Sequence, residues 1–120
     1  MKNVLIVEDE MIIAMVLKKF IQQIGYNVFA IVKTGNEAIN MVKDNELALI
    51  LMDMKLKGDI DGFNTMQEIR KFSDIPIIYT TGNSEIQVKQ KIEQTNNALF
   101  LIKPIDYDEL KFSVEKIMAT

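Results

Sequence analysis

The sequence predicts an α/β fold: a doubly wound, three-layer sandwich with a five-stranded parallel sheet and five helices. Short apolar or β-branched runs alternate with longer stretches of helical period, which is the pattern of consecutive βα units. Several of the short runs are apolar throughout, as expected for strands that are covered on both faces. The length of 120 residues fits one domain, and we expect that domain to span residues 1–120.

The predicted strands are short and apolar, and they cover residues 3–7, 27–32, 47–52, 75–80 and 98–102. The predicted helices follow them at residues 11–24, 35–43, 63–72, 84–94 and 107–118. In the first helix the apolar side chains recur at helical spacing, at Ile12, Met15, Val16, Phe20 and Ile24. No repeat, low-complexity tract or linker divides the chain.

Helix ends are marked by capping residues. Gly25 follows the first helix and is a predicted C-terminal cap. Ser84 and Asp106 are predicted N-caps, and Asp106 with Glu109 three residues later forms a capping box. These signals place the boundaries of the first, fourth and fifth helices.

Composition excludes several classes of function. The net charge of −3 gives no electrostatic basis for binding nucleic acid. No apolar run approaches the roughly 18 residues of a membrane span, and the apolar N-terminal stretch is too short for a signal peptide, so we expect a cytoplasmic protein. The absence of Cys and His excludes thiol and imidazole nucleophiles, disulfides and Cys- or His-based metal sites. The chemistry must therefore rest on carboxylates, hydroxyls, lysine and the backbone.

Polar side chains follow four of the five predicted strands at their carboxyl ends: Glu8, Asp9, Asp53, Thr80, Thr81 and Lys103. The carboxyl ends of parallel strands lie at one edge of the sheet, where ligands bind at the topological switch point. Taken singly, each residue has an ordinary explanation, as an N-cap, a strand-end threonine or a solvated lysine. Their coincidence at one edge predicts a site.

The residue types at this edge suggest phosphoryl chemistry. Clustered carboxylates repel one another, and hard oxygen donors suit Mg²⁺, with Mn²⁺ as a second candidate. We therefore interpret Glu8, Asp9 and Asp53 as a metal cluster, with Asp53 on the central strand as the nucleophile toward phosphorus. Lys103 offers a positive charge and Thr81 a hydroxyl donor for the phosphoryl oxygens.

The chain resembles the receiver domains of two-component response regulators over essentially its whole length. The matching segments are VLIVEDE at 4–10, LMDM at 51–54, DGF at 61–63, IPIIYTTG at 75–82 and KP at 103–104. Their order and spacing make a specific signature. The resemblance implies a flavodoxin-like fold with strand order 2-1-3-4-5.

The resemblance also implies roles for these residues. Asp53 would take a phosphoryl group from the phosphohistidine of a sensor histidine kinase or phosphotransfer protein. Glu8, Asp9, Asp53 and the main-chain carbonyl of Lys55 would bind Mg²⁺, and Lys103 would contact the phosphoryl group. The chain would be a phosphorylation switch that catalyses only its own phosphorylation and dephosphorylation, not a turnover enzyme.

The switch implied by the resemblance involves Thr81, which lies five residues after Pro76, and the aromatic Phe100, three residues before Lys103. Phosphorylation would shift a conformational equilibrium. Helix four, strand five and helix five would then meet a downstream partner. A phosphorylation-dependent dimer is another implied outcome. The alternative for Phe100 is a half-buried strand aromatic without a switch role.

Three departures from the family pattern bear on regulation. The stretch 55–61 lacks the frequent Met-Pro and is about one residue longer than usual, and Gly82 replaces the commoner alanine. Lys55 and Asn83 occupy the two positions that tune dephosphorylation in the family. We expect the Lys55 side chain to cover the phosphorylated Asp53 and slow hydrolysis, the alternative being a solvated surface lysine.

Two other functions use a similar sheet. A Mg²⁺ phosphohydrolase with an aspartyl nucleophile usually has a second acid two residues later, where this chain has Lys55. A flavin-binding domain needs a hydroxyl- or glycine-rich loop after the first strand, where Glu8 and Asp9 would repel the flavin phosphate. Both are weaker explanations than the signalling switch.

Overall fold

The computed structural model describes residues 2–82 and 86–119. Its strands are β1 (Asn3–Val7), β2 (Asn27–Val32), β3 (Leu49–Asp53), β4 (Ile77–Thr81) and β5 (Ala98–Ile102). Its helices are α1 (Met11–Ile24), α2 (Gly35–Asp44), α3 (Gly62–Ile69), α4 (Ile86–Glu93) and α5 (Tyr107–Met118). All ten predicted elements are thus confirmed in type and order.

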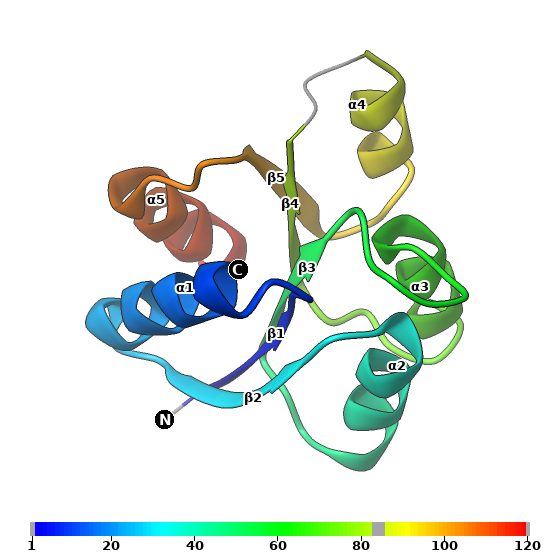
Figure 1. The fold of residues 1–120 in the computed structure, drawn as a ribbon, viewed down its shortest axis with the longest axis horizontal. Helices are drawn as coiled ribbons and strands as arrows, with labels where there is room; N and C mark the ends of the chain where they lie inside the picture. Colours follow the sequence, from blue (N-terminus) through cyan, green and yellow to red (C-terminus); the bar gives the residue numbers. More distant parts are fainter. Residues whose placement is uncertain (1, 83–85, 120) are drawn as a thin grey trace.

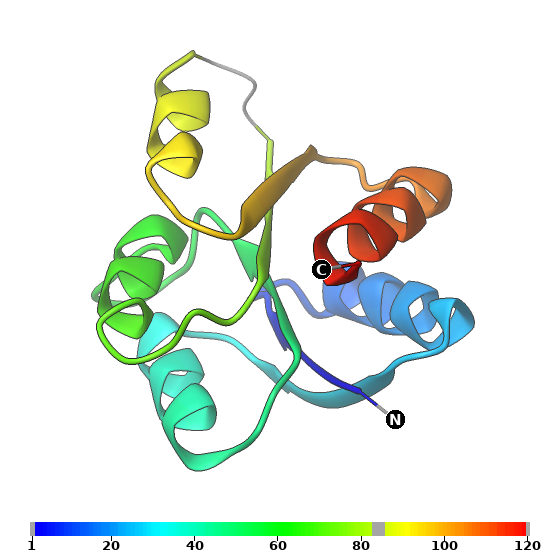
Figure 2. The same cartoon turned by 180° about the vertical axis from the view of Figure 1, so that it is seen from behind.

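A single parallel sheet with the order β2-β1-β3-β4-β5 forms the middle layer. Helices α1 and α5 cover one face, and α2, α3 and α4 cover the other (Figure 1). The view from behind shows the same division into layers (Figure 2). No helix in the described ranges is long and apolar enough to cross a membrane. The predicted doubly wound fold and strand order are confirmed.

Side chains of the central strands alternate between two apolar cores, as the two-residue period of a strand requires. Toward α2, α3 and α4 point Leu5, Val7, Ile50, Met52, Ile77 and Tyr79. Toward α1 and α5 point Val4, Ile6, Leu49, Leu51, Ile78 and Leu101. Every residue of β3 and β4 is buried, which explains their uninterrupted apolar sequence.

Several boundaries differ from the prediction. Strand β3 extends to Asp53, and β4 starts after Pro76, which has no N–H to donate to a neighbouring strand. Helix α3 ends at Ile69 rather than Phe72, because the following residues form tighter bonds, including one from the Phe72 amide to the Ile69 carbonyl at 3.0 Å. The predicted N-cap Ser84 lies outside the described residues.

The predicted caps Gly25 and Asp106 are confirmed, although of the capping box only the Asp106 half is formed among the described residues. Gly25 ends α1 with φ of 108°, a left-handed conformation that favours glycine. Asp106 caps α5, because its side chain accepts a hydrogen bond from the Glu109 amide at 3.1 Å.

The apolar spacing predicted for α1 marks its buried face only in part. Phe20 and Ile24 pack against the core as predicted, but the fully buried residues of the helix are Ala14, Leu17 and Ile21. Of the predicted stripe, Ile12, Met15 and Val16 are exposed. Helix α1 is therefore apolar on two sides, and one of them remains uncovered near the carboxyl edge of the sheet.

Candidate functional site

Three charged side chains meet at the carboxyl edge of the sheet. The Nζ atom of Lys103 donates a hydrogen bond to Oδ2 of Asp53 at 3.1 Å. The same Nζ lies 3.3 Å from Oε1 of Glu8. Glu8 is 1% exposed and Asp53 is 5% exposed, so the ionised carboxylates depend on a nearby cation.

Main-chain amides orient both carboxylates. The Lys55 amide donates to Oδ1 of Asp53 at 3.0 Å, and the Glu10 amide donates to Oε2 of Glu8 at 3.1 Å. The Glu8 amide in turn donates to the Val32 carbonyl at 2.9 Å, which ties the end of β1 to β2. Each carboxylate therefore keeps a second oxygen directed at Lys103.

The start of α3 packs directly on the strand end that carries Asp53. The Gly62 amide donates to the Met54 carbonyl at 3.0 Å, and Asp61 caps α3 by accepting from the Asn64 amide at 2.8 Å. A Cβ at position 62 would overlap the Asp53 carbonyl oxygen and lie 3.0 Å from the Met54 Cα. Only glycine leaves room for this approach. The Asp61-Gly62 pair thus holds the start of α3 against the backbone of Asp53 and Met54.

The acidic residues are arranged so that they could hold a metal ion. Glu8, Asp9 and Asp53 each offer one carboxylate oxygen, and these oxygens all lie within 4.8 Å of one another. Among the described residues, the buried Oε1 of Glu8 accepts no hydrogen bond, although Lys103 lies near it. A set of hard oxygen donors with excess negative charge fits a divalent cation such as Mg²⁺.

Burial and charge shift the pKa values at this edge. Burial raises the pKa of Glu8 from 4.5 to about 7; the negative charge of Asp53 adds to this rise, while the Glu10 amide and Lys103 oppose it. Burial lowers the pKa of Lys103, but the hydrogen bond and charge of Asp53 and the charge of Glu8 outweigh the burial and raise it overall. Without a bound cation, Glu8 therefore holds a proton for part of the time at neutral pH.

Of the remaining predicted residues that the structure describes, Thr81 and Lys55 lie at this edge of the sheet and Phe100 lies within β5. Thr81 is the buried last residue of β4, and its carbonyl accepts from the Lys103 amide at 2.7 Å. Phe100 is half-buried on β5, paired in register with Tyr79. The Lys55 side chain is exposed beside the site. Asn83 lies outside the described residues.

Thr80, which sequence reasoning left as a strand-end threonine, lies beside Asp53 in the structure. This residue is 1% exposed, pairs in register with Asp53, and has a hydroxyl with no hydrogen-bond partner in the part of the chain that the structure describes. Strand alternation was the available signal, because neighbours on a strand point to opposite faces. It places Thr80, not Thr81, on the face toward which Asp53 points.

Comparison with known proteins gives a consistent assignment. The family model for the response regulator receiver domain matches residues 4–115. The transcriptional regulatory protein ZraR of Escherichia coli (strain K12) is 30% identical over 118 residues, which cover 98% of this chain and 26% of ZraR. The chain thus spans about a quarter of the length of this relative.

Two solved structures share the fold. A two-component response regulator from Clostridium difficile has a TM-score of 0.90 and 26% identity, covering 99% of this chain and 97% of that one. The receiver domain of a sensor histidine kinase from Pseudomonas aeruginosa PAO1 has a TM-score of 0.87 and 27% identity, covering 99% and 98%. That structure has a magnesium ion coordinated in its active site cleft.

These matches favour neither a phosphohydrolase nor a flavin-binding domain. The fold, the acidic group that could hold Mg²⁺ and the family match over residues 4–115 all agree. The chain belongs to the response regulator receiver domain family, the signalling switches of two-component systems.

Proposed function

We propose that Asp53 is the phosphoacceptor of this receiver domain and that Mg²⁺ supports its phosphorylation. The observation that carries the proposal is the buried Asp53 carboxylate, which lies beside two further acids and a lysine. Glu8, Asp9 and Asp53 would hold the ion together with the main-chain carbonyl of Lys55. Mn²⁺ is a second candidate, because it accepts the same oxygen ligands.

The proposed reaction adds a phosphoryl group to a carboxylate oxygen of Asp53. This oxygen bonds to phosphorus while the bond from phosphorus to an imidazole nitrogen of the donor breaks, and the nitrogen keeps the electron pair. Bound Mg²⁺ supplies positive charge that offsets the charge of the carboxylates and phosphoryl oxygens. Lys103 and the Thr81 hydroxyl donate hydrogen bonds to phosphoryl oxygens, and the Lys55 amide keeps the Asp53 carboxylate oriented. Beyond its own phosphorylation and dephosphorylation, no turnover is proposed.

The uncovered side of α1 supports a docking surface for the phosphodonor protein. Four large apolar side chains of its first two turns are exposed: Met11, Ile12, Met15 and Val16. Ile12 is 81% exposed. Grouped apolar exposure of this kind is typical of an interaction surface.

This surface is continuous with the site. Ile12 and Val16 line an apolar hollow of about 400 Å³ together with Lys103, Pro104 and Ile105. Lys103 therefore belongs both to the hollow and to the Asp53 cluster. A sensor histidine kinase or phosphotransfer protein that covers α1 is the proposed occupant, because its phosphohistidine must reach Asp53.

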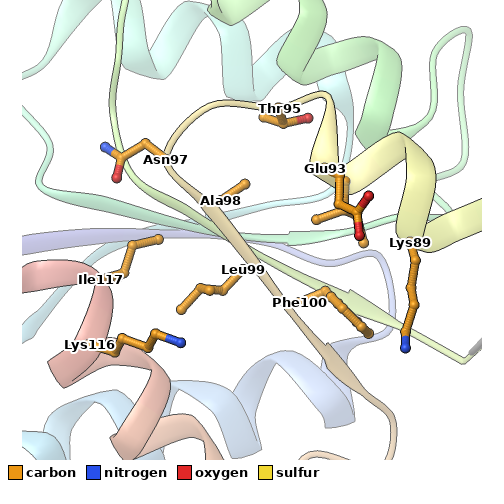
Figure 3. A pocket seen from close by; sticks show the side chains of 10 residues that line it. Lys89, Glu93, Thr95, Asn97, Ala98, Leu99, Phe100, Lys116 and Ile117 are labelled. Atoms are coloured by element: carbon orange, nitrogen blue, oxygen red, sulfur yellow. The ribbon is translucent and has the colours of Figure 1, made fainter.

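The edge strand β5 carries the proposed output surface. A groove of about 470 Å³ runs along β5 between α4 and α5. In Figure 3, Leu99 and Phe100 lie between Lys89 from α4 and Lys116 from α5. Because Phe100 is half-buried here, a change in its packing would alter the groove. We propose that phosphorylation acts through Thr81 and Phe100 on this surface, which meets a downstream partner or a second copy of the chain.

Replacement of Asp53 by asparagine tests the acceptor. With Mg²⁺ and a small-molecule phosphodonor, intact mass spectrometry is expected to show one added phosphoryl group on the wild type and none on Asp53→Asn. Chelation of the metal should also prevent the addition. The matched control is Asp59→Asn, which changes an exposed carboxylate in the following loop and should gain the group normally. Phosphorylation of Asp53→Asn at the wild-type rate would disprove the assignment.

The raised pKa of Glu8 predicts how pH affects stability. The folded protein binds the Glu8 proton more tightly than the unfolded chain, so the free energy of unfolding of the metal-free protein falls as pH rises from about 4.5 to about 7. We expect Glu8→Gln to remove this loss and to stabilise the metal-free protein at pH 8 by about 2 to 4 kcal/mol. Urea unfolding with a chelator, repeated across this pH range, measures the effect. An identical pH dependence in both proteins would contradict it.

Lys55 is expected to prolong the phosphorylated state. Its exposed cationic side chain follows Asp53 by two residues and can obstruct the attacking water. Lys55→Ala should therefore lose its phosphoryl group at least about twofold faster than the wild type. Lys57→Ala changes another exposed lysine of the same loop and should match the wild type. Decay of the phosphorylated mass over time gives both rates, and equal rates would refute the shielding role.

The substitution Ile12→Gln tests the docking surface. Glutamine is compatible with the helix, but it removes apolar surface at this position. Transfer from a phosphorylated sensor kinase that serves the wild type should slow by about tenfold, the effect of losing one central contact. Phosphorylation by a small-molecule donor should not change. Lys19→Gln alters an exposed residue two turns farther along α1 and serves as the control. Equal slowing with both kinds of donor would instead indicate damage to the site.

A further inference from the structure

Glu8, Asp53 and Thr80 form one row across the carboxyl edge of the sheet. Val7 pairs with Met52 in register, which places Glu8 beside Asp53, and Asp53 pairs directly with Thr80. The residues before each of the three belong to the core beneath α2, α3 and α4. Alternation therefore turns all three side chains toward the face covered by α1 and α5.

The hydroxyl of Thr80 is buried without a partner. Thr80 is 1% exposed, and across residues 2–82 and 86–119 its Oγ1 makes no hydrogen bond. A buried hydroxyl left unsatisfied is destabilising by roughly 1–3 kcal/mol. Valine has nearly the same shape and lacks this cost. We therefore expect the Thr80 hydroxyl to have a hydrogen-bond partner in another state of the site.

The Lys103 side chain crosses β4 to reach the acids. Its backbone follows β5 and its amide donates to the Thr81 carbonyl on β4, whereas its Nζ contacts Asp53 on β3 and Glu8 after β1. Strand β4 lies between β3 and β5. Because alternation turns Thr80 to the same face, we expect its hydroxyl to lie beside the path of the Lys103 side chain.

A divalent cation would bind the same carboxylates that the Lys103 ammonium contacts. The Nζ atom of Lys103 is directed at Oδ2 of Asp53 and Oε1 of Glu8. Because a bound divalent cation repels the ammonium group, we expect Lys103 to give up at least one of these contacts when the metal binds. An ammonium group carries three donors and must then find another acceptor.

We propose that Thr80 is a positioning residue, whose hydroxyl accepts a hydrogen bond from Lys103 Nζ when Mg²⁺ occupies the carboxylates. The inference rests on the proposed Mg²⁺ site and extends it. Thr80 Oγ1 keeps the ammonium beside Asp53, where the phosphoryl group arrives. This role would give the buried hydroxyl of Thr80 a partner that it lacks among the described residues.

The test compares Thr80→Val with Thr80→Ser, which keeps the hydroxyl. The chain has no tryptophan, so Mg²⁺ affinity is measured by calorimetric titration. Thr80→Val should bind Mg²⁺ about three- to tenfold more weakly than the wild type, the range expected for loss of one hydrogen bond, and Thr80→Ser should restore binding. In a Lys103→Met background the valine substitution should have no further effect, because Thr80 acts through Lys103.

Melting of the metal-free proteins separates this role from a structural one. Thr80→Val should melt at the wild-type temperature or above, because no hydrogen bond is lost. The control Thr95→Val removes a buried hydroxyl that lies 3.2 Å from the Tyr79 hydroxyl and should melt lower while binding Mg²⁺ normally. A wild-type Mg²⁺ affinity for Thr80→Val, or an equal loss in the Lys103→Met background, overturns the role of Thr80 alone. A wild-type protein that binds no Mg²⁺ overturns the proposed function as well.

Discussion

The ammonium group of Lys103 places one positive charge against two buried carboxylates, and the carboxyl edge of the sheet depends on it. Two like charges 4 Å apart repel by about 4 kcal/mol at an effective dielectric constant of about 20. Burial is the main cause of the raised pKa of Glu8, and repulsion from Asp53 adds to it, while the Glu10 amide and Lys103 oppose the rise. Three positive species could therefore neutralise these carboxylates: the Lys103 ammonium, a proton on Glu8 and a divalent cation.

The topology brings these charged groups together. Lys103 follows β5, which is separated from β3 by β4, so a long side chain must span the intervening strand to reach Asp53. The bond between the Lys103 amide and the Thr81 carbonyl sets the start of that path. On the other side, glycine at position 62 lets α3 approach the Asp53 backbone. The strand order thus determines which charged side chains come within reach of one another. Local packing determines how closely α3 approaches Asp53.

Much of the fold and part of the site could be predicted from the sequence. Apolar runs and helical spacing identified every element, because fully covered strands such as β3 and β4 are apolar throughout. The acids and the lysine could be grouped because parallel strands end at one edge. The buried face of α1 could be predicted only in part, since the helix is apolar on two sides and only packing selects Ala14, Leu17 and Ile21 as its fully buried residues. The pairing of Thr80 with Asp53 could not be predicted, because it depends on strand register, which hydrophobic patterns alone leave open.

The uncovered side of α1 has a consequence for signalling fidelity. Two of its exposed residues, Met11 and Met15, have unbranched side chains that adapt to surfaces of different shape. If the phosphodonor protein docks on α1 as proposed, such a surface would tolerate variation in its partner and would accept several kinases of similar form. Discrimination between kinases would then come from repulsive features at the border of the surface, such as the charges of Glu10 and Lys18. Affinity and discrimination would therefore reside in different side chains of the same helix and could evolve separately.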